Sequence, residues 1–183
     1  FSYFQACQIN EKINFSVPTG NFGDVYAGYL SKKMGLPIDK LIVATNQNDI
    51  LHRAISNGQY KAHSVVETLS PSMDIQVASN FERLIYDIND QNTDKTSKIM
   101  QSIKNEKKYL IEEKELKKIR KDFVSETISE QELLSCIKKV YENYKIIIDP
   151  HTAVGLGALE KINLVGKSVV LSTAHPCKFP EAI

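Results

Sequence analysis

The sequence predicts an α/β fold in which a parallel β-sheet is flanked by helices, and two observations carry this prediction. Short apolar runs rich in Ile and Val alternate along the chain with segments whose apolar residues recur at helical spacing. Helix-capping residues and glycines separate the two kinds of segment. Strands that alternate with helices in this way form parallel sheets covered by helices. With 183 residues, the chain is long enough to bury a core of its own.

The first ninety residues are expected to hold two strands and three helices. The expected strands are 13–17 and 41–45, and the expected helices are about 22–34, 50–57 and 81–88. Gly35 and Gly58 close the first two helices, because glycine readily takes the left-handed conformation that ends a helix. Residues 68–74 contain Ser-Pro-Ser and are expected to form a loop.

The composition changes between residues 91 and 145, where Lys and Glu dominate and glycine is absent. Leu116, Ile119 and Phe123 fall on one helical stripe, and a Ser-x-x-Glu capping box opens a second. We therefore expect a helical insertion at about 91–145, within a domain that spans residues 1–183. Its lysines fit a solvated helix face better than an anion-binding surface.

The alternation of strands and helices resumes after this segment. Residues 145–148 and 168–172 are the third and fourth expected strands. Between them, Asp149 can cap a helix that has Pro150 at its first position and runs to about Ile162. Four strands separated by helices complete the expected parallel sheet.

Charge and composition exclude several classes of function. The net charge is +1, so neither a nucleic acid nor a membrane surface is expected as a partner. No apolar run approaches the roughly 20 residues of a membrane-spanning helix. The three cysteines form no Cys-x-x-Cys pair, which argues against a disulfide framework or a metal site and favours a reducing, cytoplasmic location. The chain begins with Phe rather than Met, so we expect it to be a piece of a longer protein.

A glycine-bearing turn follows the first expected strand, within the string Val17–Asp24. Amide groups at a helix N-terminus lack intrahelical partners, and the helix dipole favours negative charge there. Gly20 and Gly23 allow positive φ and let the backbone approach a phosphate without a Cβ atom in the way. An ordinary strand-to-helix turn explains the same spacing, which matches neither the dinucleotide-binding pattern nor the P-loop pattern.

Polar residues follow three of the expected strands, at Thr19–Asp24, Asp149–Thr152 and Ser172–His175. Because ligands of parallel sheets bind beyond the carboxyl ends of the strands, we expect these clusters to meet at one site. His151 and His175 are candidates for acid–base groups or anion ligands, or for side chains that satisfy a backbone group. No catalytic triad can be assigned from spacing.

Five blocks of sequence, in order along the chain, resemble threonine synthases. They are residues 17–24, 44–51, 70–83, 149–155 and 171–176. Any one of these blocks is a weak signal. Together they extend the resemblance over nearly the whole chain, with the Lys- and Glu-rich segment as its least characteristic part.

The resemblance implies a fold of the tryptophan-synthase type with pyridoxal 5′-phosphate (PLP) as cofactor. Enzymes of this family convert O-phospho-L-homoserine and water to L-threonine and phosphate, so the implied small-molecule partner is O-phospho-L-homoserine. The implied ligands of the cofactor phosphate lie in the turn after the first strand and are Gly20, Asn21, Phe22 and Gly23.

Two later blocks are implied to surround the rest of the cofactor and the substrate. Thr173 is implied to place its hydroxyl near the pyridine nitrogen, where a neutral group does not enforce a protonated ring. Asp149, His151 and Thr152 are implied to bind substrate, because their block follows the neighbouring strand.

The Schiff-base lysine of the family lies in a segment that this sequence does not include. We therefore assign no catalytic residue and expect the chain alone to be inactive, because covalent cofactor chemistry needs that amine. The expected protein partner is the N-terminal part of the same enzyme or a second copy, since half of a parallel sheet exposes an unpaired edge. Two alternatives stay open, a related PLP-dependent amino-acid lyase and a non-catalytic threonine-synthase-like protein that binds a phosphorylated ligand.

Overall fold

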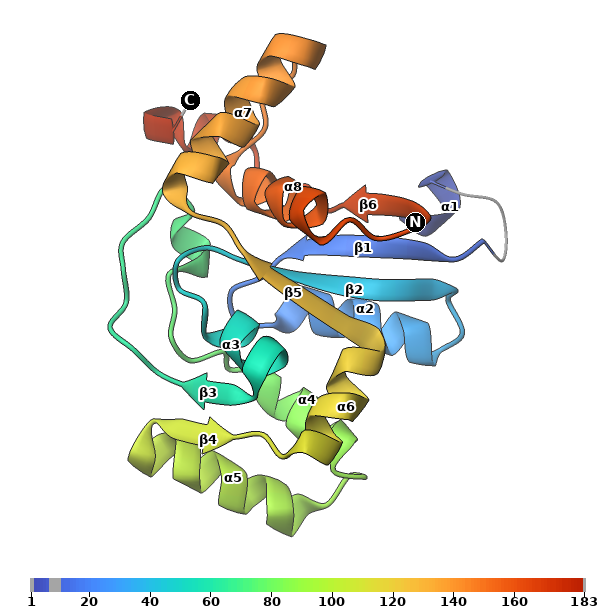
Figure 1. Ribbon diagram of the computed structural model, residues 1–183, viewed down its shortest axis with the longest axis vertical. Helices are drawn as coiled ribbons and strands as arrows, with labels where there is room; N and C mark the ends of the chain where they lie inside the picture. Colours follow the sequence, from blue (N-terminus) through green and yellow to red (C-terminus); the bar gives the residue numbers. More distant parts are fainter. Residues whose placement is uncertain (1, 7–10, 183) are drawn as a thin grey trace.

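The computed structural model describes residues 2–6 and 11–182, which are built around a four-stranded sheet (Figure 1). In spatial order the strands are β5 (Phe123–Thr127), β2 (Ile38–Thr45), β1 (Ile13–Pro18) and β6 (Lys167–Val170). Every neighbouring pair in this sheet runs parallel. The predicted fold class, an α/β arrangement with a parallel sheet flanked by helices, is therefore confirmed.

Helices cover both faces of this sheet (Figure 1). One face carries α7 (Glu130–Tyr144) and α8 (Pro150–Ile162), and the other carries α2 (Gly23–Lys33), α3 (Ile50–Asn57), α4 (Phe81–Ile88) and α6 (Glu113–Asp122). Beyond the second layer lie α5 (Thr93–Glu106) and a short antiparallel ribbon of β3 (Gln59–Lys61) and β4 (Lys108–Leu110). The remaining elements are α1 (Ser2–Ala6) and three short 3₁₀ turns, Pro71–Met73, Pro176–Lys178 and Pro180–Ala182. Among the described residues, no helix has both the length and the apolar character of a bilayer span.

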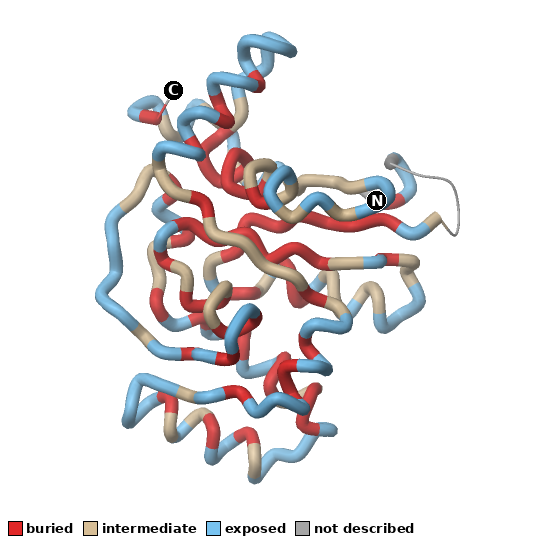
Figure 2. The backbone as a smooth tube through the Cα atoms, in the orientation of Figure 1, coloured by how far each residue is buried: buried red, intermediate tan, exposed pale blue. Residues whose placement is uncertain are grey.

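The alternation of side chains along β2 divides the core in two. Leu41 and Val43 pack in the cluster with α2, α3 and α4, whereas Ile42 and Ala44 pack in the cluster with α7 and α8. All four side chains are fully buried. Successive strand residues point to opposite faces, so an apolar run without alternation fits a sheet that is covered on both sides. Figure 2 shows the result, a centre in which β1 and β2 are buried along most of their length.

Small residues bring α8 very close to β1. The Ser16 hydroxyl donates a hydrogen bond to the Gly155 carbonyl oxygen at 2.6 Å. A Cβ atom at position 155 would lie 3.0 Å from a methyl carbon of Val170 and 3.2 Å from the ring of Pro18. Glycine therefore suits position 155, because a Cβ atom there would force Val170 or Pro18 to shift by a few tenths of an ångström.

The sequence places most elements correctly and one strand wrongly. Strands β1, β2 and β6 and helices α2, α3, α4 and α8 lie where they were predicted, to within a few residues. The prediction of a strand at 145–148 is wrong, because the residues that follow α7 are irregular and Ile146 and Ile147 are about half exposed. The fourth strand of the sheet is β5, which lies inside the segment expected to be helical.

The helical stripe through Leu116 and Ile119 stops before Phe123. Phe123 has the extended dihedral angles −113° and 144°, begins β5, and pairs with Leu41 of β2. Its ring is fully buried and lies 5.6 Å from that of Phe22, so tertiary pairing overrides the local helical spacing. Residues 91–145 thus contain two strands as well as three helices. That they form an insertion in the domain stays a prediction.

Candidate functional site

The turn that was predicted to bind an anion joins β1 to α2 at the carboxyl edge of the sheet. The pairing of β1 with β2 continues past the strand, because the Thr19 amide donates to the Ala44 carbonyl oxygen at 2.8 Å. The Thr19 hydroxyl donates to the Val17 carbonyl oxygen at 2.6 Å. Thr19 is buried, so these two bonds fix the point at which the turn starts.

The left-handed residue of this turn is Phe22, with φ 72°, whereas Gly20 and Gly23 do not take positive φ. The freedom of glycine to take positive φ is therefore not used at either position. The ring of Phe22 is fully buried and meets that of Phe81 edge-to-face, with 5.2 Å between ring centres. Burial of this ring offsets the roughly 1–2 kcal/mol that a left-handed conformation costs an L-residue.

The two glycines are needed for close approach instead. A Cβ atom at Gly20 would lie only 2.6 Å from the Ser72 carbonyl oxygen. A Cβ atom at Gly23 would lie 3.2 Å from both Asn21 Oδ1 and Asn80 Nδ2. The loop that carries Ser72 therefore rests directly on the turn at Gly20, and the side chains of Asn21 and Asn80 border Gly23.

Three backbone amides of the turn are free for a ligand. The Gly23 amide donates to Asn21 Oδ1 at 3.1 Å. Within the described part of the chain, the amides of Gly20, Asn21 and Phe22 make no hydrogen bond. Asp24 follows in the first turn of α2, and partial desolvation raises the pKa of its carboxyl group. The turn thus offers three donors beside a helix N-terminus, which is the arrangement that anions bind.

A network of polar side chains fixes the neighbouring 68–74 loop. Asn46 Nδ2 lies 2.8 Å from both Thr68 Oγ1 and Asp74 Oδ1, and Asn48 Nδ2 donates to the same carboxylate oxygen at 3.0 Å. The Thr68 amide donates to Asp74 Oδ2 at 2.8 Å. Sequence reasoning misses this network, although the position of Asn46 directly after β2 is a signal for it.

The start of α8 carries Asp149, His151 and Thr152, all of them buried. Asp149 caps the helix, because its Oδ1 accepts from the His151 amide at 2.9 Å and its Oδ2 accepts from the Thr152 hydroxyl. His151 Nδ1 lies 3.0 Å from Asp149 Oδ1, and its Nε2 accepts from the Ser72 amide at 3.2 Å. Because Nε2 accepts a hydrogen bond, the geometry assigns the ring proton to Nδ1.

The predicted clusters meet through Ser72. Its carbonyl oxygen borders Gly20, and its amide binds His151 at the start of α8. The Thr152 hydroxyl lies 3.3 Å from Ser172 Oγ, just beyond β6. We call the set of residues that meets here the strand-end cluster; it consists of the turn 19–23, the 68–74 loop, residues 149–152 and Ser172.

The last predicted cluster joins this site only at Ser172. Thr173 is exposed and makes no hydrogen bond with the described residues, which leaves its hydroxyl open to a ligand. His175 accepts from the Cys177 amide at 3.2 Å and so closes a local turn. The structure does not bring His175 into contact with the strand-end cluster.

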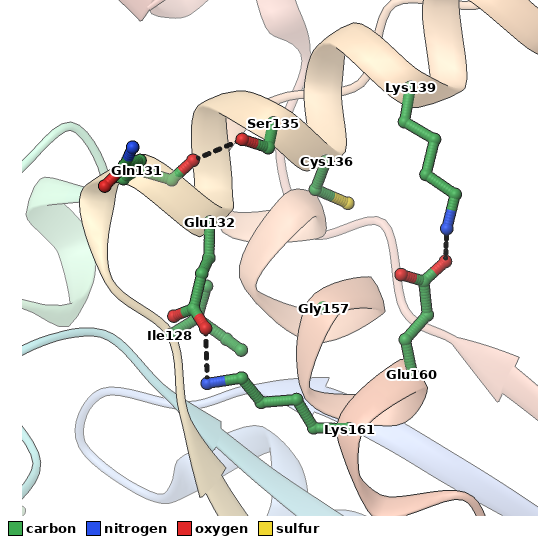
Figure 3. A pocket seen from close by; sticks show the side chains of 9 residues that line it. All are labelled: Ile128, Gln131, Glu132, Ser135, Cys136, Lys139, Gly157, Glu160 and Lys161. Atoms are coloured by element: carbon green, nitrogen blue, oxygen red, sulfur yellow. Dashed lines mark hydrogen bonds and ion pairs between the residues drawn. The ribbon is translucent and has the colours of Figure 1, made fainter.

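A cavity of about 510 Å³ between α7 and α8 is a second candidate (Figure 3). Two ion pairs cross it, Glu132 with Lys161 at 2.7 Å and Lys139 with Glu160 at 2.8 Å. Cys136 lies between them, and burial raises the pKa of its thiol to about 11. Paired charges and a protonated thiol are poor reagents, so the strand-end cluster is the stronger candidate. The described residues contain no group of three or more side chains that could hold a metal ion.

Comparison with known proteins relates the chain to one family. The family described as "Threonine synthase, C-terminal" matches residues 152–183. The threonine synthase of Pseudomonas aeruginosa is 44% identical over 176 residues, which cover 95% of this chain and 38% of that protein. The threonine synthase of Saccharomyces cerevisiae is 43% identical over 206 residues, which cover 100% of this chain and 40% of that protein. The chain spans about two fifths of the length of these curated relatives.

Two solved structures also superpose closely on the chain. The PLP-bound threonine synthase from Brucella melitensis has a TM-score of 0.94 and 42% sequence identity, over 99% of this chain and 40% of that one. The yeast threonine synthase has a TM-score of 0.92 and 40% identity, over the same shares of the two chains. The resemblance indicated by the five sequence blocks is confirmed, and this chain is a relative of threonine synthases along nearly its whole length.

Proposed function

We propose that the chain forms part of a threonine synthase that binds PLP and converts O-phospho-L-homoserine and water to L-threonine and phosphate. The names of its relatives and the PLP-bound Brucella melitensis structure support this proposal. The structural observation that carries it is the set of three free amides at the start of α2.

The turn before α2 fits the phosphate group of PLP. Gly20, Asn21 and Phe22 present the free amides, and Gly23 begins an 11-residue helix whose dipole favours negative charge. The two glycines let the turn pack closely against Ser72 and Asn80, and its free amides are the groups proposed to bind phosphate oxygens. We assign these four residues to the cofactor phosphate. When bound, PLP supplies the electron sink for chemistry at the carbon atoms of the substrate.

The residues beyond β6 and at the start of α8 are assigned to the other parts of the site. The exposed hydroxyl of Thr173 is proposed to lie beside the pyridine nitrogen of PLP. A neutral group at that place does not force the ring nitrogen to be protonated. Asp149 and Thr152 are proposed to border the substrate, and His151 lies between them in the sequence. Their mutual hydrogen bonds satisfy the fully buried Asp149 carboxylate, which would otherwise be costly to bury.

The 183-residue chain alone is proposed to be inactive. No lysine takes part in the hydrogen bonds that join the described residues of the strand-end cluster, whereas PLP chemistry needs a lysine amine. The rest of such an enzyme, or a second copy of this chain, is the proposed protein partner. A cytoplasmic location also stays a proposal, supported by the cysteines, which form no Cys-x-x-Cys pair.

Substitution of Gly20 tests the phosphate assignment in the complete natural protein. In Gly20→Ala the added methyl group collides with the Ser72 carbonyl oxygen and displaces the turn. We expect the affinity for PLP, measured by fluorescence titration, to fall at least about tenfold, the effect of losing one charge-assisted hydrogen bond. Gly35→Ala is the matched control at the other end of α2, where a Cβ atom meets no atom within 4 Å.

Gly35 has φ 105°, so the control is expected to lower stability while it keeps the affinity for PLP. Unchanged affinity in a folded Gly20→Ala protein would contradict the phosphate assignment. Phosphate release from O-phospho-L-homoserine, measured on the same samples, separates the remaining possibilities. A related lyase or a non-catalytic binder holds its phosphorylated ligand without releasing phosphate from this substrate.

A further inference from the structure

We propose that His151 is a positioning residue that holds the 68–74 loop against the turn 19–23, and that it does not contact substrate. This role rests on the proposed function and narrows the part that His151 plays in it. The proposal rests on three observations. They are the hydrogen bonds of the imidazole ring, the burial of the ring, and the contact between Ser72 and Gly20.

Both ring nitrogens of His151 are already in use. Nδ1 lies 3.0 Å from Asp149 Oδ1, and Nε2 accepts from the Ser72 amide at 3.2 Å. The residue is 3% exposed, and its ring packs against Phe179 with 4.8 Å between ring centres. A substrate therefore finds no free nitrogen on this ring.

Asp149 fixes the orientation of the His151 imidazole ring. Its fully buried carboxylate is itself fixed by the start of α8, because it accepts from the His151 amide and from the Thr152 hydroxyl. A carboxylate that accepts from Nδ1–H leaves the Nε2 lone pair to point away from the helix. The lone pair then receives the amide of Ser72.

The bond to Ser72 places the 68–74 loop beside the turn. On the same residue, the amide binds His151 and the carbonyl oxygen stands 2.6 Å from the position that a Cβ atom of Gly20 would take. The loop is held separately on both sides of Ser72, because Asn46 binds Ser70 at 2.9 Å and Asp74 at 2.8 Å. His151 is thus the attachment of Ser72 on the α8 side, and its loss leaves the Ser72 amide, next to Gly20, without its partner.

Replacement of His151 by glutamine or by asparagine separates the two hydrogen bonds of the imidazole ring. In His151→Gln, the side-chain carbonyl oxygen reaches toward the position of Nε2 and can accept from Ser72. The shorter side chain of His151→Asn reaches only the position of Nδ1, so it keeps the contact with Asp149 and loses the bond to Ser72. Both variants are made in the complete natural protein. Amide hydrogen exchange of a peptide covering residues 68–74 and titration with PLP are the two measurements.

In His151→Asn, we expect the 68–74 peptide to exchange at least about tenfold faster than in the wild type, and the affinity for PLP to fall by about the same factor. In His151→Gln, we expect both quantities to stay within about threefold of the wild type. Exchange is expressed relative to peptides from β1 and β2, so that a general loss of stability is not mistaken for release of the loop.

Equal relative exchange of the 68–74 peptide in all three proteins overturns the proposal. An equal rise in KM for O-phospho-L-homoserine in both variants, with exchange and PLP affinity unchanged, also overturns it, because direct substrate contact predicts that result. The exchange measurement needs no ligand. A wild-type protein that binds no PLP therefore refutes the proposed function, while the role of His151 in holding the loop is still decided by exchange.

Discussion

Phe22 anchors the turn between β1 and α2 through a ring that points into the core. The ring lies 5.2 Å from that of Phe81 on α4 and 5.6 Å from that of Phe123 on β5. Aromatic pairs in such arrangements contribute about 0.5–1.5 kcal/mol beyond the burial of their surface. The side chain is therefore fixed in the core, while the amide of the same residue has no hydrogen-bond partner among the described residues.

Removal of this anchor is expected to destabilise the fold strongly. Phe22→Ala deletes a fully buried ring, so the free energy of unfolding should fall by about 3–5 kcal/mol in urea denaturation. Phe4→Ala makes the same chemical change on α1, where the side chain is 64% exposed. The control should stay within about 0.5 kcal/mol of the wild type. Similar losses in the two variants would show that Phe22 is not an anchor.

The sequence predicts the location of this turn but not the tertiary contacts that explain why each residue stands there. Phe22 takes the left-handed conformation because of contacts with α4 and β5, and Gly20 is a glycine because Ser72 needs the space. Asn46 reaches Asp74 across 28 residues of the chain. Short-range patterns contain no information on such contacts, so the residues at the strand ends could be predicted and the bonds between them could not.

Among the elements, β5 shows how a strand can be hidden in a helical segment. The run from Glu113 to Thr127 begins with apolar residues at helical spacing and ends with Phe-Val-Ser-Glu-Thr, whose β-branched residues favour a strand. Phe123 fits both the helical spacing that precedes it and the strand that follows it. Only the pairing with β2 decides between them. The sequences of β1 and β2 contain no helical spacing of apolar residues that competes with the strand pattern. Both strands could therefore be predicted from sequence.

The capping box of α7 predicts a dependence of stability on pH. The Lys161 ammonium group and the amide and hydroxyl of Ser129 lower the pKa of Glu132 from 4.5 to about 2. A carboxyl group whose pKa is lower in the folded state stabilises the protein above pH 4.5, and this contribution disappears as the pH falls toward 2. Glu132 is partly exposed, so the contribution is at most about 1 kcal/mol.

Glu132→Gln should therefore lower the free energy of unfolding at pH 7, and the difference from the wild type should vanish near pH 2. Urea denaturation at a series of pH values measures both. Glu142→Gln on the same helix is the control, because that carboxylate makes only a 3.8 Å contact with Lys138 at the surface. A Glu132 difference that stays constant with pH would contradict the ion pair with Lys161.

For the whole molecule, burial predicts an order of local opening. All residues of β1 are buried, whereas β3 and β4 each expose at least two of their three residues in part (Figure 2). Few buried contacts allow local unfolding at low free energy. Amides of β4 and α5 should therefore exchange well before those of β1 and β2 in hydrogen-exchange mass spectrometry. Simultaneous exchange of both regions would mean that the ribbon and the sheet unfold as one unit.

The close contact between Ser16 and Gly155 has a consequence for how ligands enter. It joins α8 to the strand that ends in the turn 19–23, so the two walls of the candidate site belong to one rigid body. Hinge motion between those walls would have to break this hydrogen bond and the close packing of Gly155 on Pro18 and Val170. The third side is formed by the 68–74 loop, which is held by the polar network around Asn46, by the bond from Ser72 to His151 and by the buried side chain of Met73. A ligand that enters on that side has to displace the loop against all of these contacts.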